Sequence, residues 1–299
     1  MSSKAVTIGG EEKSLDRKRA ATTKRAPRLG AVLALGVACL VVGISLFPLY
    51  VMITTALKSE SDIFAWPPTW IFEPTYQSFY NAFFLFGGQN VLVFIFNSVL
   101  VTAVSTLLAV TLGAMAAYGL ARFRFRANKH LAFFILSTRF APPVAFIVPL
   151  YLMFNAVGLI DSPLALIIFY TSMNLSFVIW VLRSFFVEIP IELEEAALVD
   201  GYTRWQVFRR VALPLVKPGL AATAILSAVF AWNEFLLASI LTQRDAATIP
   251  VYLSGFSASM GIAWGEYMAV GFFAVAPIMI FTLLLQRHLV RGLTFGAVR

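Results

Sequence analysis

The sequence reads EAALVDGYTRWQVFRRVALP from Glu195 to Pro214, a polar insert between apolar segments long enough to cross a bilayer. Before it, Pro190 breaks the chain, and within it Gly201 favours a helix stop because glycine adopts the left-handed conformation at little cost. Thr203 and Gln206 then form the pattern of a capping box. We therefore predict a helix–turn–helix. A chain otherwise suited to lipid has no folding reason to carry it, so we expect a soluble partner to dock there.

The composition predicts an all-α integral membrane protein. Of the 299 residues, 60% are hydrophobic and 13% charged, with a mean hydropathy of +0.83, whereas soluble domains carry about 25% charged residues. Residues 1–28 are predicted to form a basic, disordered tail, and residues 29–299 a single transmembrane domain. Six apolar runs reach the roughly 20 residues needed for a span. They lie near 29–55, 92–120, 131–154, 163–182, 218–242 and 267–288.

The distribution of positive charge predicts the orientation of these six spans. If the N-terminus is cytoplasmic, the tail, the loops after the second and fourth spans and the C-terminus hold 20 lysines and arginines. The other side holds Lys58 and Arg244, and Arg139 lies inside a span. The positive-inside rule then places both termini in the cytoplasm. The net charge of +8 is thus a topology signal and not the footprint of a nucleic-acid-binding protein.

Periodicity alone leaves two interpretations of the polar insert open. One is a docking hairpin, and the other is an amphipathic hairpin lying on lipid headgroups, for which Trp205, Arg209 and Arg210 would be suitable. The first helix counts against the second interpretation. An anionic inner leaflet would repel its closely spaced Glu192, Glu194 and Glu195.

The insert resembles the signature loop of the membrane subunits of binding-protein-dependent ABC importers. Both have EAA, then a glycine, then an aliphatic residue and Leu-Pro after a gap. The resemblance implies that the loop over residues 190–217 docks into a cleft of a cytoplasmic ATPase subunit. The positions that it carries over to this sequence are Glu195, Ala196, Ala197, Asp200, Gly201, Val211, Leu213 and Pro214.

Four further stretches resemble the carbohydrate branch of these importers, close to the smaller membrane subunit of the maltose-type system. They are AYGLARF at 117–123, WNEF at 232–235, TIPV at 248–251 and RGLTFGAV at 291–298. With the loop, the resemblance extends over roughly residues 30–299. It implies a permease subunit that works with a second permease subunit, two ATPase subunits and an extracytoplasmic solute-binding protein.

Charged and broken segments inside the spans are candidates for the translocation path. A charge at the bilayer centre costs about 2.5–3.5 kcal/mol on insertion scales, so Arg139 requires a reason. Because Pro142 and Pro143 follow it, we expect a broken helix, which either lines the path or holds a structural arginine at the kink. In the fifth span, Asn233 and Glu234 could bind sugar hydroxyls beside the stacking face of Trp232. They could equally form hydrogen bonds between helices.

The last outer loop, over residues 243–266, is expected to contact the binding protein. Gly255, Gly261 and Gly265 favour a flexible loop. By resemblance, this loop would probe the sugar site of a docked binding protein. The candidate residues are Thr248, Pro250, Gly255 and Gly261.

The sequence shows no phosphate-cradling Gly-rich loop and no cluster of side chains spaced for metal binding or acid–base catalysis. We therefore expect no enzyme, no metal and no cofactor bound by this chain, with ATP and Mg²⁺ used by the partner ATPase. The favoured interpretation is a permease subunit that imports a sugar, oligosaccharide or related polyol across a bacterial or archaeal cytoplasmic membrane. The alternative is a stand-alone secondary transporter, which predicts an internal repeat that the sequence does not obviously show.

Overall fold

The computed structural model describes residues 29–84, 90–123, 126–256 and 263–294 of the chain. Helices make up most of these ranges and none of them contains a strand, so the predicted all-α fold class is confirmed. The chain divides within its first described helix into two compact units, Met1–Met52 and Ile53–Arg299. That helix, α2 (Leu29–Leu57), carries no charged residue.

The second unit continues with two short helices, α3 (Glu60–Ile63) and α4 (Gln77–Phe84). Two long apolar helices follow. α5 (Val91–Arg122) begins after Asn90 and α8 (Pro163–Glu188) after Ser162, and both side chains accept a backbone hydrogen bond from the first turn. Together with α2, three described helices are long and apolar enough to cross a bilayer.

Between α5 and α8 the chain forms a broken segment. α6 (Asn128–Thr138) is followed by the 3₁₀ turn η2 (Pro143–Phe146) and then by α7 (Ile147–Ala156). The two halves are bent by 91°. Proline lacks the backbone N–H that would continue a helix, so the break falls at the predicted Pro142-Pro143 pair.

The polar insert follows α8, and the helices that contain it extend slightly beyond Glu195–Pro214. They are α9 (Ile191–Val199), α10 (Arg204–Val207), a turn of π-helix η3 (Phe208–Ala212) and α11 (Leu213–Leu215). The chain then bends by 77° into α12 (Lys217–Trp232). With this pair and the broken pair each counted as one span, the described residues hold up to five candidate spans.

The last helices are α13 (Leu236–Leu241), α14 (Ile249–Gly255) and α15 (Trp264–Thr294). The predicted fifth span, 218–242, is thus interrupted at residues 233–235. The part of α15 from Trp264 to Ile280 is apolar but shorter than a full span.

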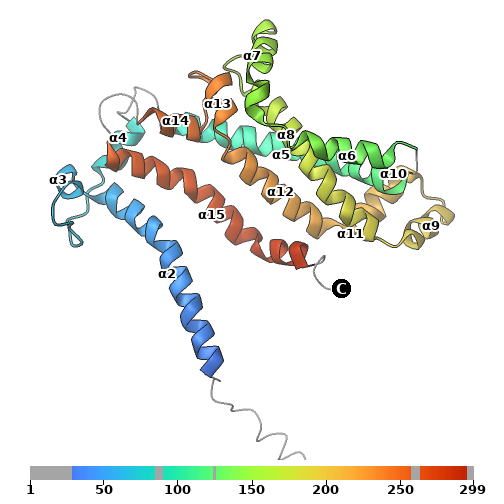
Figure 1. Cartoon of the computed structure of the whole chain (residues 1–299), viewed down its shortest axis with the longest axis horizontal. Coiled ribbons are helices and arrows are strands. Elements are labelled where there is room, and N and C mark those ends of the chain that lie inside the picture. Colours follow the sequence, from blue (N-terminus) through green and yellow to red (C-terminus); the bar gives the residue numbers. More distant parts are fainter. Residues whose placement is uncertain (1–28, 85–89, 124–125, 257–262, 295–299) are drawn as a thin grey trace, which may run out of the picture. The chain divides into compact units, whose positions relative to one another are not determined.

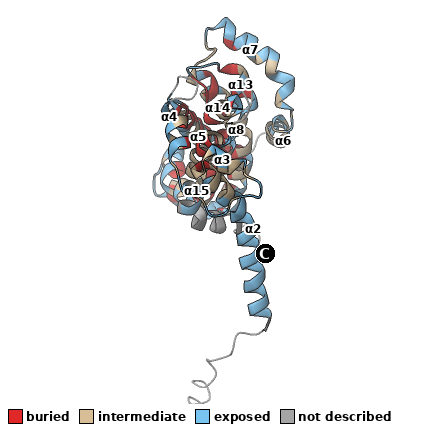
Figure 2. Cartoon of the chain, turned by 90° about the vertical axis from the view of Figure 1, so that its left-hand side faces the viewer, coloured by how far each residue is buried: buried red, intermediate tan, exposed pale blue. Residues whose placement is uncertain are grey.

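α5 and α8 form the most extensive helix pair of the second unit, and α12 packs against both of them and against α15 (Figure 1). α5 and α8 approach closely because position 113 is a glycine. A Cβ built there would collide with the Val178 side chain. Buried residues concentrate around α5, α8 and α14, whereas most of α6 and α7 is exposed (Figure 2).

Two buried clusters lie at opposite ends of α5. One surrounds its Arg122 end, and its larger members include Tyr118, Phe186 and Phe208. The other surrounds its Val91 end, and its larger members include Phe94, Ile249 and Phe256. The first cluster packs beneath the polar insert, and the second packs beneath the start of the last outer loop.

Candidate functional site

The polar insert forms the predicted two-helix hairpin. α9 ends at Val199, and Gly201, two residues later, makes the turn with a φ of +89°, in the region that favours glycine. The Gly201 N–H donates to the Leu198 carbonyl at 3.1 Å and the Tyr202 N–H to the Ala197 carbonyl at 3.0 Å. This pair of bonds is a Schellman motif. The sharp turn at Gly201 is therefore built into the backbone.

The second helix of the hairpin is held by the predicted capping box. The Gln206 N–H donates to the Thr203 hydroxyl at 3.3 Å, and the Thr203 N–H donates to the Gln206 side-chain oxygen at 2.8 Å. Both halves satisfy backbone donors at the helix start. The hairpin is a defined two-helix element with a fixed turn.

α9 presents one exposed face that mixes acidic and apolar side chains. We call it the outer α9 face and define it as Glu192, Leu193, Glu195, Ala196 and Val199, all of which are exposed. Val199 is 88% exposed and Leu193 is 48% exposed. In the turn that follows α9, Asp200 and Gly201 are exposed as well. This face has the exposure that a docking surface requires.

Not every residue predicted for docking lies on this face. Ala197 points inward and is only 8% exposed. Val211 and Leu213 are half-buried, and Leu213 packs against the cluster around Tyr118. Pro214 is exposed within α11. The structure therefore divides the motif into outward residues such as Glu195 and Ala196, and inward residues that fix the hairpin to the helices behind it.

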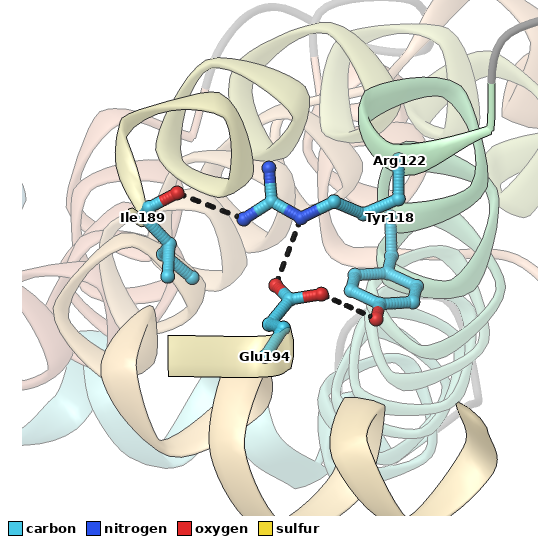
Figure 3. Close-up of polar contacts among 4 residues, drawn as sticks. All are labelled: Tyr118, Arg122, Ile189 and Glu194. Carbon is cyan, nitrogen blue, oxygen red and sulfur yellow. Dashed lines mark hydrogen bonds and ion pairs between the residues drawn. The ribbon is translucent and has the colours of Figure 1, made fainter. Parts of the chain in front are cut away.

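The inward side of α9 carries a buried ion pair. The Glu194 carboxylate is 2% exposed and lies 2.8 Å from Arg122 Nε at the end of α5 (Figure 3). Its second oxygen accepts a 2.8 Å hydrogen bond from the Tyr118 hydroxyl. Arg122 Nη2 also donates to the Ile189 carbonyl at 3.0 Å. Both carboxylate oxygens are thus paired, which a buried charge needs.

The role of Glu194 was not predicted from the sequence, although local signals for it are present. Glu194 and Ala197 are three residues apart and so share one helix face. Tyr118 and Arg122 are four apart within the AYGLARF stretch, so their side chains lie on one face of α5. What the sequence does not show is that these two faces meet.

Arg139 lies at the break after α6 and contacts two other helices. Its Nη1 donates to the Met173 carbonyl of α8 at 3.2 Å, and its guanidinium lies 4.8 Å from the centre of the Phe230 ring of α12. It lines an open cavity of about 600 Å³ together with Pro143. Pro142 precedes η2, and its carbonyl accepts from the Ala145 N–H. Arg139 thus lines the cavity and also forms a hydrogen bond to a neighbouring helix.

The three candidates of the fifth span all have polar partners at the α12–α13 break. Trp232 Nε1 donates to the Ala274 carbonyl of α15 at 2.9 Å. The Asn233 amide donates to the Val229 carbonyl of its own helix. The Glu234 carboxylate accepts from the first N–H groups of α13 and from the Tyr170 hydroxyl. These contacts match the interpretation of bonds within and between helices.

The outer-loop candidates differ in exposure. Thr248 is only 4% exposed, Pro250 is half-buried and Gly255 is exposed. Gly261 lies outside the described residues. Since Thr248 faces inward, Pro250 and Gly255 are the more accessible of the described candidates.

The start of this outer loop, residues 243–249, is held by side chains from elsewhere in the chain. The Asp161 carboxylate accepts four backbone N–H groups, from residues 243–246, at 2.9–3.1 Å. From α5, Asn97 Nδ2 donates to the Asp245 and Ala247 carbonyls, and the Ser98 hydroxyl accepts from the Ile249 N–H. Side chains from two distant segments therefore hold residues 243–249.

Asp161 adopts a φ of +58°, a conformation that aspartate visits more readily than most residues. Partial burial acts to raise the pKa of its carboxyl, but the four backbone hydrogen bonds outweigh burial and lower the pKa below its ordinary value. The carboxylate form is thus the one that holds the loop.

Comparison with known proteins gives consistent matches. A family model described as a binding-protein-dependent transport system inner membrane component matches residues 109–295. The trehalose transport system permease protein SugB of Mycobacterium tuberculosis is 38% identical, over 87% of this chain and 94% of that protein. The diacetylchitobiose uptake system permease protein DasC of Streptomyces coelicolor is 34% identical, over 85% and 91% respectively.

Among solved structures, a bacterial ABC transporter involved in alginate import matches with a TM-score of 0.70. It is 21% identical and covers 89% of this chain and 99% of its own. An alginate transporter in complex with a pentasaccharide-bound periplasmic protein matches with a TM-score of 0.60 at 18% identity, over 86% and 95%. These two likenesses support the fold.

The family match covers more than half of the chain, and it agrees with the apolar helices described above. The protein is a multi-pass membrane protein. The chain belongs to the family of binding-protein-dependent transport system inner membrane components.

Proposed function

We propose that this chain is the permease subunit of an ATP-driven importer for a sugar, an oligosaccharide or a related polyol, delivered by a solute-binding protein. The observation that carries the proposal is the outer α9 face, held by the Schellman turn at Gly201 and the capping box at Thr203. The substrate class rests on relatives that are named as permeases for trehalose and diacetylchitobiose. The permease itself binds no cofactor, and a partner subunit hydrolyses ATP with Mg²⁺.

The proposed topology has six spans over residues 29–299, with both termini in the cytoplasm of a bacterium or archaeon. α2, α5, α8, the broken pair of α6 and α7, α12 with α13, and α15 supply the six segments. The excess of lysine and arginine on one side supports the orientation.

In the assembly, two permease subunits and two ATPase subunits work together with the binding protein. Glu195 and Ala196 on the outer α9 face contact one ATPase subunit. Binding there requires exposed side chains on a rigid element, which the hairpin supplies. Pro250, Gly255, Gly261 and the segment after Thr248 meet the binding protein on the opposite side.

The substrate passes beside the broken helix at Pro142-Pro143. Arg139 and Pro143 are the candidates of this path that line the open cavity of about 600 Å³. The remaining path candidates, Trp232, Asn233 and Glu234, shape the α12–α13 break, because their polar groups are engaged by protein partners. Arginine donors suit hydroxyl and carboxylate oxygens of a sugar.

The proposal is tested by reconstituting the full complex in proteoliposomes with Gly201→Asp or Glu195→Lys. Both variants should insert normally and retain ATP hydrolysis, but sugar uptake per ATP should fall at least about tenfold, the equivalent of 1.4 kcal/mol. Gly158→Asp is a matched control, since Gly158 also has a positive φ (+69°) but lies in the loop between α7 and α8. Normal uptake by both docking variants would show that α9 does not couple the ATPase to transport.

A further inference from the structure

The docking hairpin and the start of the last outer loop both contact the same helix, α5, at its opposite ends. At its Arg122 end, α5 holds the inward side of α9 through Glu194. At its Val91 end, α5 holds residues 245–249 through Asn97 and Ser98. Asn97 and Arg122 are 25 positions apart, which is about 37 Å along a helix. Both contact sets lie on one continuous element.

The chain connectivity does not by itself join α9 to α5. α9 follows α8 directly through Ile189 and Pro190, so a displaced α9 would act first on α8. The Arg122–Glu194 pair links positions 72 residues apart in sequence. Arg122 also binds the Ile189 carbonyl at the end of α8. One guanidinium therefore connects α5, α8 and α9.

Aromatic packing makes this junction stiff. The Tyr118 ring lies edge-on to Phe186 of α8 at 5.4 Å and against Phe208 of η3 at 4.9 Å. The hydroxyl of the same tyrosine binds Glu194. Since packed interiors transmit displacement, α5, α8, α9 and η3 should move as one body at this end.

The ion pair is a poor device for stability alone. A buried salt bridge is often no better than apolar residues of the same volume, because desolvation offsets the attraction between the charges. Its directional bonds do fix the angle and register of α9 on α5. Stability alone would be served by a leucine at position 194, so a geometric role accounts better for the glutamate.

We propose that Glu194 and Asn97 are positioning residues that fasten the two ends of α5, which thereby couples the ATPase-docking hairpin to the outer loop that meets the binding protein. This inference rests on the proposed function, because it names the residues through which that machine communicates. Docking of the loaded binding protein would displace residues 245–249, and α5 would deliver that displacement to α9.

The test uses the assembled complex in lipid nanodiscs and measures the ratio of ATP hydrolysis with and without loaded binding protein. Glu194→Gln and Asn97→Ala should each lower this stimulation at least about fivefold, the lower range of allosteric coupling, while basal hydrolysis and assembly stay normal. Because both act through α5, the double variant should be no worse than the more severe single variant. Asn81→Ala is the matched control, since that amide binds Glu266 on α15.

If Glu194→Gln fails to assemble, Tyr118→Phe replaces it, because it removes one hydrogen bond and keeps the ion pair. Unchanged stimulation in the single variants, or losses that multiply in the double variant, would overturn the role of α5 and leave the importer assignment intact. A wild-type complex that takes up sugar without ATP hydrolysis would overturn both.

Discussion

The hydroxyl of Tyr170 on α8 donates a 2.9 Å hydrogen bond to the carboxylate of Glu234, at the break between α12 and α13. The same carboxylate accepts from the Leu237 and Ala238 N–H groups at 3.0 and 3.1 Å. Glu234 thus caps α13 and ties the break to α8. The Glu234 carboxylate, a candidate sugar ligand, is thus engaged in hydrogen bonds within the protein.

Glu234→Ala should therefore destabilise the protein, because it leaves two backbone donors unpaired and removes the 2.9 Å acceptor of the Tyr170 hydroxyl. We expect a loss of about 1–3 kcal/mol, seen as a lower Tm in a thermal shift assay in detergent. Tyr170→Phe removes only one of the three bonds and should cost less. If Glu234→Ala leaves the Tm unchanged and raises the KM for sugar uptake, Glu234 is a ligand and not a cap.

Gly113→Ala should loosen the pairing of α5 with α8. The new Cβ would lie 3.0 Å from the Val178 Cβ and closer still to its Cγ1, and overpacking of this kind costs about 1–3 kcal/mol. Gly119→Ala on the same helix is the control, because no atom lies within 4 Å of its added Cβ. The Tm should fall for Gly113→Ala alone. Equal shifts for the two variants would contradict the close approach at Gly113.

Arg139 and Phe230 should be energetically coupled. A guanidinium over an aromatic face contributes about 0.5–2 kcal/mol, more when it is desolvated. In a double-mutant cycle of Arg139→Gln and Phe230→Leu, the Tm losses should be less than additive by an equivalent amount. Arg139→Gln should also reduce sugar uptake, because the cavity loses its charged group, whereas Phe230→Leu should reduce it less. Strict additivity would show that the two side chains act independently.

The Asp161 carboxylate should make the outer loop sensitive to acid. Its pKa is lowered in the folded protein, so its stabilising effect is complete above the ordinary aspartate pKa of about 3.9 and is lost as the pH falls through the lowered value. Asp161→Asn should mimic that loss at neutral pH. Hydrogen exchange of the amides of residues 243–246 should then rise about fivefold or more. Unchanged exchange would show that other contacts hold the loop.

The elements of the hairpin were predictable because their signals are local. The turn at Gly201 and the capping box at Thr203 and Gln206 each depend on residues within one or two helical turns, and the structure confirms them. The break at Pro142-Pro143 was predictable for the same reason, since proline cannot donate the bond that continues a helix. The all-α class followed from composition.

What the sequence could not supply are contacts between distant segments. Glu194 looks like one of several surface glutamates until α5 brings Arg122 against it. Asp161 has no local pattern that marks it, because its four partners lie more than 80 residues away. The predicted fifth span was interrupted by a cap at Glu234, which depends on α8. Such pairings depend on tertiary packing, which outweighs local propensity.

Site-specific cross-linking tests the docking of α9 most directly. In a variant with Cys39 replaced by serine, one new cysteine would be placed at Ala196, which is exposed, or at Ala197, which is 8% exposed. With a short bifunctional reagent in the assembled complex, Ala196→Cys should form a covalent product with the ATPase subunit, and Ala197→Cys should not. A complex that imports sugar but yields no ATPase adduct from Ala196→Cys would contradict the docking of α9.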